Sequence, residues 1–188
     1  MNKPVGYLVS AVVALAMFAF APMPSAQAGG APFGDPDSVA YAAKLWSALK
    51  EAKLVGSDRI LSKPYTGQHP HGAVLTNLES KLTVDGDTGA VIVKSNFGGK
   101  GVSINAVSQY PDKYLGAVTV MYQRAGYDPD NNDWFWAKYL PDGSLDKNPK
   151  GMKLAGRVAK VNPPAGCIAC HKGAPGGDMV FTNDRYKK

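Results

Sequence analysis

The sequence predicts an α+β fold in which one N-terminal helix precedes a mainly antiparallel β-sheet. Apolar residues recur at helical spacing between residues 36 and 54, whereas after residue 60 they alternate with period two in separate segments. Stretches rich in Gly, Pro, Asp and Asn divide these segments, and consecutive strands joined by short polar turns form antiparallel sheets. The 188 residues, 45% of them hydrophobic, are enough for one domain with a core.

The N-terminus has the features of an export signal. A lysine precedes an apolar run over residues 8–21, and Ala26-Gln27-Ala28 offers small residues at a cleavage site. An uncleaved membrane anchor is the alternative, but two prolines end the run before it reaches the roughly 20 residues that span a bilayer. The sequence therefore predicts a signal peptide over residues 1–28, a single mature domain over residues 29–188 with no membrane span, and a periplasmic location.

The predicted helix covers residues 36–54. Asp35 is a capping residue, a proline occupies the first helical position, and an acid follows in the first turn. Gly56 is placed to close the helix. Four residues repeat at helical spacing and predict its buried stripe: Tyr41, Leu45, Leu49 and Ala52.

Four strands are predicted to follow, at residues 73–78, 90–97, 116–123 and 134–139. Asp85-Gly86-Asp87 and the Asp- and Asn-rich residues 128–132 supply turns between them, and the second turn predicts a hairpin. Residues 98–111 are predicted to form a loop.

The charge pattern argues against a nucleic-acid-binding surface. The chain carries a formal net charge of +6, but its basic residues are spread singly and in pairs rather than clustered in a stripe. We therefore expect this charge to serve solubility or the docking of an acidic periplasmic redox partner, with no nucleic-acid partner.

Both cysteines lie in the segment Cys167-Ile168-Ala169-Cys170-His171, near the C-terminus. In an exported protein this spacing is typical of a c-type haem attachment site, because two thiols three residues apart reach the two vinyl groups while the next imidazole reaches the iron. A zinc knuckle needs further ligands nearby, and a thioredoxin-like pair usually opens a helix after a strand. The sequence therefore predicts covalently bound haem c on Cys167 and Cys170, with His171 as the proximal iron ligand.

The position of this motif bears on the second axial ligand. Met179 follows it too closely for its side chain to reach the opposite haem face. Other methionines and histidines reach the iron only if the tertiary fold brings them there: Met121, Met152, His69 and His71. This favours an iron that is open on one side, where a small ligand can bind.

Several segments together resemble the cytochrome P-460 family, which includes the β-sheet cytochromes c-prime, over most of the mature chain. The segments that carry the likeness are Pro70-His71-Gly72, Val91-Ile92-Val93-Lys94, residues 117–122, residues 133–139, and the cysteine motif followed by Asp178-Met179-Val180-Phe181-Thr182. The resemblance implies a dimeric antiparallel-sheet protein with a five-coordinate haem, whose members oxidise hydroxylamine or bind nitric oxide and similar diatomic molecules.

In the hydroxylamine-oxidising members a strand lysine is joined covalently to the porphyrin, and the resemblance places Lys94 at that position. Lys94 alternates in phase with Ile92, so its amine faces the core if Ile92 does, and burying an unpaired ammonium is costly. The alternative is a lysine at a strand end that reaches solvent.

The chain departs from those enzymes in one respect. Removing protons near the iron calls for a base such as a carboxylate, yet no Asp or Glu occurs between Asp146 and Asp178. Whether the chain is a hydroxylamine-oxidising enzyme, a non-catalytic binder of nitrogen oxides, or an electron carrier with Met121, Met152 or His69 as sixth ligand therefore stays open.

Two further groups are candidates for a role near the haem. Five aromatic residues are available to line an apolar pocket, although plain core packing is their commoner role: Phe97, Trp134, Phe135, Trp136 and Phe181. His69 and His71 lie two residues apart, which on an extended segment points them to opposite sides. A metal site shared by these two histidines is therefore not expected, and one of them is expected to orient a haem propionate or bond to backbone.

Overall fold

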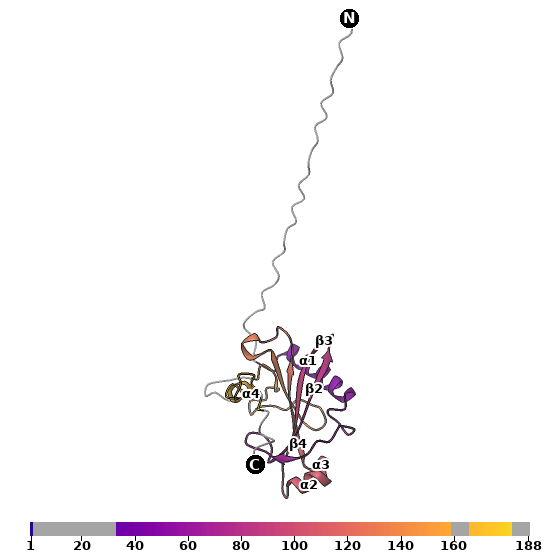
Figure 1. Ribbon diagram of the computed structural model, residues 1–188, viewed down its shortest axis with the longest axis vertical. Coiled ribbons are helices and arrows are strands. Elements are labelled where there is room, and N and C mark those ends of the chain that lie inside the picture. The colour runs from indigo at the N-terminus through magenta and orange to yellow at the C-terminus, as the bar shows by residue number, and fades with distance from the viewer. Residues whose placement is uncertain (2–32, 159–165, 182–188) are drawn as a thin grey trace.

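The computed structural model describes residue 1 and residues 33–158 and 166–181, so the predicted signal peptide lies outside the described residues apart from Met1. A six-stranded antiparallel sheet forms the centre of the fold, and its strands follow one another in sequence order (Figure 1). The strands are β1 (Tyr65–Thr66), β2 (Val74–Val84), β3 (Asp87–Phe97), β4 (Leu115–Gln123), β5 (Trp134–Tyr139) and β6 (Ala155–Gly156). The predicted α+β class is confirmed.

The helices are α1 (Pro36–Glu51), α2 (Ile104–Gln109), α3 (Pro111–Tyr114) and α4 (Cys167–His171), with a 3-10 turn η1 (Pro129–Asn131). Figure 1 shows α1 and α4 on opposite sides of the sheet, with α2 and α3 at one end of it. Within the described part of the chain, no helix is both long enough and apolar enough to cross a membrane.

Helix α1 begins as predicted and ends three residues earlier than predicted. The Asp35 carboxylate accepts a hydrogen bond from the Ser38 backbone N–H at 2.8 Å, which satisfies one of the free donors of the first turn. At the other end Lys53 takes a left-handed φ of 56°, and the Leu54 N–H returns to the Leu49 carbonyl at 2.8 Å. Leu54 is buried, so packing of that side chain, rather than Gly56, stops the helix.

The first face of the sheet packs against α1 and forms the main core. Helix residues Tyr41, Leu45 and Leu49 are buried there as predicted, whereas Ala52, the fourth residue of the predicted stripe, follows the end of the helix and is exposed. The sheet contributes one residue in two along each strand: Leu82, Val84, Val91, Val93, Val118, Val120, Tyr122, Phe135, Ala137 and Tyr139. This alternation leaves the other residues of the same strands on the second face.

Strand β2 runs six residues beyond its predicted end, because Leu82 and Val84 continue the alternation into the main core. The β2–β3 turn consists of Asp85 and Gly86, whose φ angles of 52° and 88° suit the twist of a two-residue hairpin. The predicted hairpin between residues 116–123 and 134–139 is confirmed by the antiparallel pairing of β4 with β5.

The prediction that residues 98–111 form a loop is wrong, because α2 lies within that segment. The Ser103 hydroxyl caps this helix by accepting from the Ala106 N–H at 3.1 Å. Val107 is buried with Val74 and Phe97 in a small separate cluster. A single buried residue in a six-residue helix is too little periodicity to recognise from sequence.

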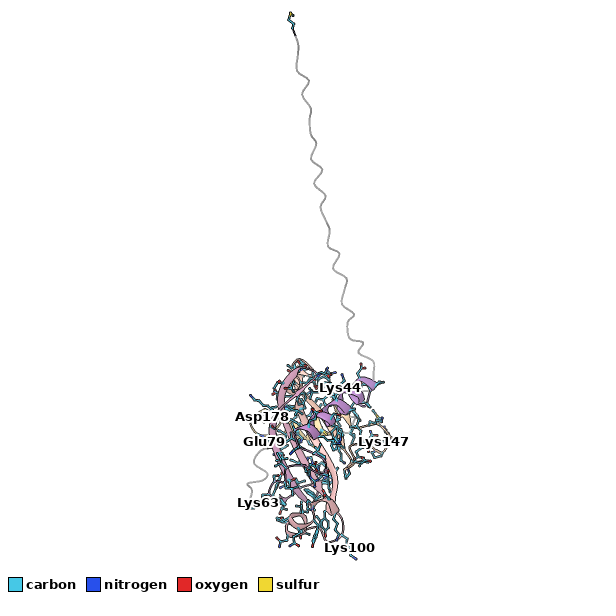
Figure 2. All side chains as sticks on the ribbon, turned by 90° about the vertical axis from the view of Figure 1, so that its right-hand side faces the viewer. Lys44, Lys63, Glu79, Lys100, Lys147 and Asp178 are labelled. Atoms are coloured by element: carbon cyan, nitrogen blue, oxygen red, sulfur yellow. The ribbon has the colours of Figure 1, made fainter. Side chains whose placement is uncertain are left out.

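The second face of the sheet is covered by the C-terminal segment, residues 166–181, which includes α4. Met121, Trp134 and Trp136 of the sheet form an apolar cluster with Ile168 and Met179 of that segment. Figure 2 shows Lys44, Lys63, Lys100 and Lys147 at well separated places on the surface. The cysteine motif packs against the apolar part of the second face.

Candidate functional site

Helix α4 places Cys167, Cys170 and His171 on little more than one helical turn. Three hydrogen bonds fasten the surrounding segment to the rest of the fold. They run from the Ile168 N–H to the Val158 carbonyl (3.1 Å), from Trp134 Nε1 to the Asp178 carbonyl (3.0 Å), and from Asn132 Nδ2 to the Gly177 carbonyl (2.8 Å). The motif is thus anchored on both sides although the helix itself has only five residues.

His171 is 9% exposed, and its ring is oriented by the backbone. Nδ1 lies 2.7 Å from the Met179 carbonyl oxygen, and a carbonyl only accepts, so Nδ1 carries the proton and Nε2 carries the lone pair. Met179 has a left-handed φ of 64°, an uncommon conformation for a residue other than glycine. Met179 thus contributes its carbonyl to the site, while its side chain is buried in the apolar cluster.

Aromatic rings surround the His171 imidazole. The ring centroids of Trp136, Phe181 and His71 lie 4.8, 5.3 and 6.4 Å from it, each at a steep interplanar angle. Trp134 also lies on this face, in the apolar cluster.

Two of the aromatic residues suggested by the sequence lie elsewhere. Phe135 alternates onto the α1 side of the sheet, and Phe97 packs with Val107. Strand periodicity alone separates Phe135 from its two tryptophan neighbours.

The two thiols differ in environment. Cys167 is partly buried, and this burial raises the pKa of its thiol to about 11, so it stays protonated near neutral pH. Cys170 is exposed. Neither cysteine is in a disulfide.

Lys94 lies on the second face of the sheet, in phase with Ile92, and is 9% exposed. Its neighbours in register are Asn77 on β2 and Thr119 on β4. Lys94 is therefore buried and does not reach solvent, contrary to the alternative prediction.

Asn96 connects this strand to His71. The amide is 7% exposed, and its Oδ1 lies 2.9 Å from His71 Nδ1. Its Nδ2 faces three acceptors, the carbonyl oxygens of Lys94 (2.9 Å) and Ala117 (3.3 Å) and the hydroxyl of Thr119 (3.2 Å). Sequence reasoning missed Asn96, although its place two residues after Lys94 is enough to put it on the same face.

The two histidines before β2 lie in a turn rather than on the extended segment that was expected, and they differ in exposure. His69 is exposed, whereas His71 is half-buried and lies beside His171. The Asn96 side chain is thus one hydrogen-bond partner of His71.

Comparison with known protein families gives a match to Cytochrome P460 over residues 74–182, which is more than half of the 188 residues. The chain belongs to the cytochrome P460 family. It is accordingly a haem-binding cytochrome. The matched region runs from β2 to the end of the C-terminal segment and leaves out α1. Comparisons with curated proteins and with solved structures gave no match.

The residues of this cytochrome P460 fit a haem. His171 offers an imidazole nitrogen in the state that binds iron, and an apolar, aromatic face lies beside it. Trp136 Nε1 is buried and has no hydrogen-bond partner within the described residues, so a bound group with a polar edge would satisfy it.

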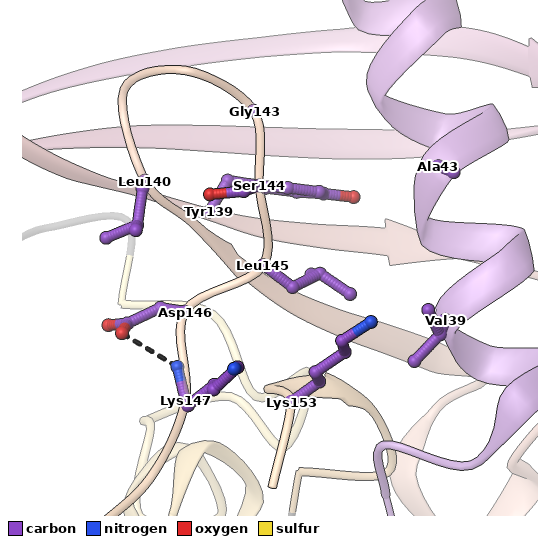
Figure 3. Close-up of a pocket in the computed structure, with 10 residues that line it drawn as sticks. All are labelled: Val39, Ala43, Tyr139, Leu140, Gly143, Ser144, Leu145, Asp146, Lys147 and Lys153. Carbon is purple, nitrogen blue, oxygen red and sulfur yellow. Dashed lines mark hydrogen bonds between the residues drawn. The ribbon is translucent and has the colours of Figure 1, made fainter. Parts of the chain in front are cut away.

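A surface hollow of about 620 Å³ lies away from this site, between α1 and the loop after β5 (Figure 3). Its lining includes Val39, Tyr139 and Lys147 but no residue of the cysteine motif. The hollow thus lies on the α1 side of the sheet, opposite the cysteine motif of α4.

Proposed function

We propose that this cytochrome P460 is a periplasmic protein with haem c attached to Cys167 and Cys170, and that it binds or oxidises small nitrogen compounds at the iron. We expect these nitrogen compounds to be nitric oxide and hydroxylamine. Signal-peptide features over residues 1–28 support export, and the family supports nitrogen chemistry. We further propose that the protein is a homodimer and exchanges electrons with a periplasmic redox partner.

The observation that carries this proposal is the arrangement of α4. Two thiols and an imidazole lie together, and the Met179 carbonyl fixes the imidazole tautomer with its lone pair on Nε2. When bound, the haem supplies an iron that takes a small ligand and exchanges electrons. The chain's own part is to hold the imidazole still, to surround it with apolar rings, and to exclude bulk water.

Attachment is tested by expressing the full chain in a host that matures c-type cytochromes. Intact-mass measurement after acid–acetone extraction should show a gain of one haem, because thioether bonds survive extraction. Cys167→Ala and Cys170→Ala should each leave one thioether, and the double variant should lose all covalent haem. A colourless product, or two thiols that react with an alkylating reagent, would contradict the proposal.

The nitrogen chemistry is tested by titrating the purified protein with nitric oxide and hydroxylamine. A change in the haem absorption spectrum reports binding, and hydroxylamine-dependent reduction of an artificial electron acceptor reports turnover. If the protein binds these compounds but does not oxidise hydroxylamine, its function is to bind or sense them. An unchanging spectrum typical of methionine-ligated iron, insensitive to both compounds, would instead indicate an electron carrier.

Lys94 is the residue we propose to be joined to the porphyrin in an enzymatic form. Its burial on the face that α4 covers supports the idea. Peptide mass spectrometry after proteolysis separates the two cases. Haem on the cysteine peptide alone argues against the linkage, whereas a peptide that joins Lys94 to the haem-bearing peptide establishes it.

A further inference from the structure

Acidic residues are missing from one long stretch of the chain, and this stretch carries the cysteine motif. Residues 147–177 contain six basic residues and no Asp or Glu. The remaining 15 basic and 15 acidic residues of the chain cancel, so the whole formal net charge of +6 belongs to this stretch. The basic residues are spaced singly here as well, but without acids between them they give this part of the molecule a positive potential.

Four of the six basic residues are exposed lysines with no ion-pair partner among the described residues: Lys147, Lys150, Lys153 and Lys172. Arg157 is instead paired with Asp128 at 3.4 Å, and Lys160 lies outside the described residues. Asp146, the acid that precedes the stretch, is paired with Lys138 at 2.8 Å. The charges of the four lysines are therefore available to a partner.

Three of these lysines belong to a hairpin after β5. Asn148 forms its turn, because its backbone N–H donates to the Met152 carbonyl and its Oδ1 accepts from the Met152 N–H, both at 2.9 Å. Lys147 and Lys153 lie directly opposite one another in an antiparallel bridge, and both line the hollow beside α1 (Figure 3). Like charges in opposite positions destabilise a strand pair, so the stability of the hairpin does not account for these two lysines.

The hairpin and the cysteine motif meet at one apolar cluster. Met152 of the hairpin packs against the cluster that contains Ile168, and Cys167 packs against the same cluster. Lys172 follows α4 directly and is exposed, as is Cys170. The positive surface therefore extends from the α4 segment across the hairpin to the hollow beside α1.

An acidic redox protein is the partner that fits this surface. Opposite charges steer diffusing proteins into contact, and electron-transfer complexes are weak contacts of small area in which such steering matters most. The stretch that holds all of the net charge is also the stretch that holds the haem-attachment residues. An anionic membrane surface is attracted by the same lysines, but it does not exchange electrons with a haem.

We propose that the surface formed by Lys147, Lys150, Lys153 and Lys172 docks an acidic redox protein that exchanges electrons with the haem. This docking role rests on the proposed haem attachment. The lysines act on the encounter between the two proteins, because charges at the edge of a contact mainly change the association rate and its salt dependence. Replacing them should leave the binding of small ligands at the iron unchanged.

The test measures electron transfer from dithionite-reduced, haem-loaded protein to plastocyanin, an acidic blue-copper protein, by stopped flow. The second-order rate constant should fall at least about tenfold between low and high ionic strength, because salt screens the attraction. Lys150→Glu/Lys172→Glu should lose at least about tenfold at low ionic strength, together with most of the salt dependence. Lys150→Gln/Lys172→Gln should give an intermediate rate constant.

Lys63→Glu/Lys100→Glu is the matched control, because it changes the net charge by the same amount. Both lysines are exposed, and Figure 2 shows them away from Lys147. The rate constant of this variant should stay within about twofold of that of the natural protein, since charges far from the contact are screened. A fall as large as that of Lys150→Glu/Lys172→Glu would show that net charge alone sets the rate, and it would overturn the docking surface.

Binding is measured separately by nuclear magnetic resonance, with plastocyanin added to ¹⁵N-labelled, haem-loaded protein. Chemical-shift changes should centre on residues 147–154 and 166–173, whereas changes centred on α2 and α3 would contradict the proposal. Sedimentation with phosphatidylglycerol vesicles tests the membrane alternative. Vesicle binding that Lys150→Glu/Lys172→Glu abolishes, without salt-dependent electron transfer to plastocyanin, would replace the redox protein by an anionic membrane.

The outcomes separate this docking surface from the proposed function. A protein that binds nitric oxide, but whose electron transfer depends neither on salt nor on these lysines, overturns the surface and leaves the function standing. A protein whose electron transfer shows both dependences, but which never takes up nitric oxide or hydroxylamine, supports the surface and overturns the function. A chain that carries no haem overturns both.

Discussion

Replacing Asn96 by alanine should destabilise the protein out of proportion to the size of the change. The side chain is 7% exposed, and its oxygen accepts from His71 at 2.9 Å. Its nitrogen has two hydrogens and three acceptors within 3.3 Å, so two of those bonds form at a time. Three hydrogen bonds at about 1 kcal/mol each give a loss of about 3 kcal/mol in the free energy of unfolding.

Asn77 provides the matched control, because it lies on the same face of the neighbouring strand. Its Nδ2 donates only to the exposed Glu79 carboxylate at 3.0 Å, and its Oδ1 is buried with no partner within the described residues. Removing a buried, unsatisfied oxygen costs little, so Asn77→Ala should change the free energy of unfolding by less than about 1 kcal/mol.

Urea denaturation of the cofactor-free protein, followed by circular dichroism, measures both variants. A loss of about 3 kcal/mol corresponds to a fall of about 6–12 °C in Tm for a domain of this size. If Asn96→Ala unfolded within 1 kcal/mol of the natural protein, and no earlier than Asn77→Ala, the hydrogen-bond network would not have the energetic role assigned to it.

Three other expectations follow from single sites. Burial would raise the pKa of Asp35, but hydrogen bonds from Ser38 outweigh the effect of burial and lower that pKa. The Asp35 carboxylate therefore stabilises the fold above about pH 4, and this stabilisation is lost as the pH falls further. Asp35→Asn should keep the cap and lose that pH dependence, whereas Asp35→Ala should cost about 1 kcal/mol at pH 7, both measured by urea denaturation. In cofactor-free protein, iodoacetamide at pH 8 should modify Cys170 well before Cys167. Cys170 is exposed, whereas burial raises the pKa of the Cys167 thiol to about 11. Equal rates of modification, measured by peptide mass spectrometry, would contradict this. Trp136→Phe removes a buried donor that has no partner among the described residues and that a bound haem would satisfy, so it should lower the Tm of the haem-loaded protein more than that of the cofactor-free protein.

The parts of the fold that sequence predicted are those with long, uninterrupted periodicity. Helix α1 combines a capping residue with three fully buried positions at helical spacing, and β3 to β5 alternate over six residues or more. Strands β1 and β6 have two residues each, and their backbone partners rather than any local pattern define them. Helix α2 was not predicted because its six residues, with one buried position, show too little periodicity.

The cysteine motif is recognisable from the sequence, whereas its surroundings are not. The spacing of Cys167, Cys170 and His171 is a local signature that is independent of the fold. The contact between His71 and His171 joins residues one hundred positions apart, and it depends on the docking of the C-terminal segment. Strand alternation puts Asn96 on the same face as Lys94, but its contact with His71 depends on the tertiary fold.

Strand β3 contributes side chains both to the main core and to the site. Val91 and Val93 face the α1 core, while Ile92, Lys94 and Asn96 face the site, so a slip of one residue in register would turn the first set toward the site and the second set toward the core. The main core therefore fixes which side chains the site receives. The site, in turn, is completed only when the C-terminal segment covers the second face. Any group that binds between them stabilises the docked segment by mass action, and by the same coupling the docked segment binds that group more tightly than the undocked one does.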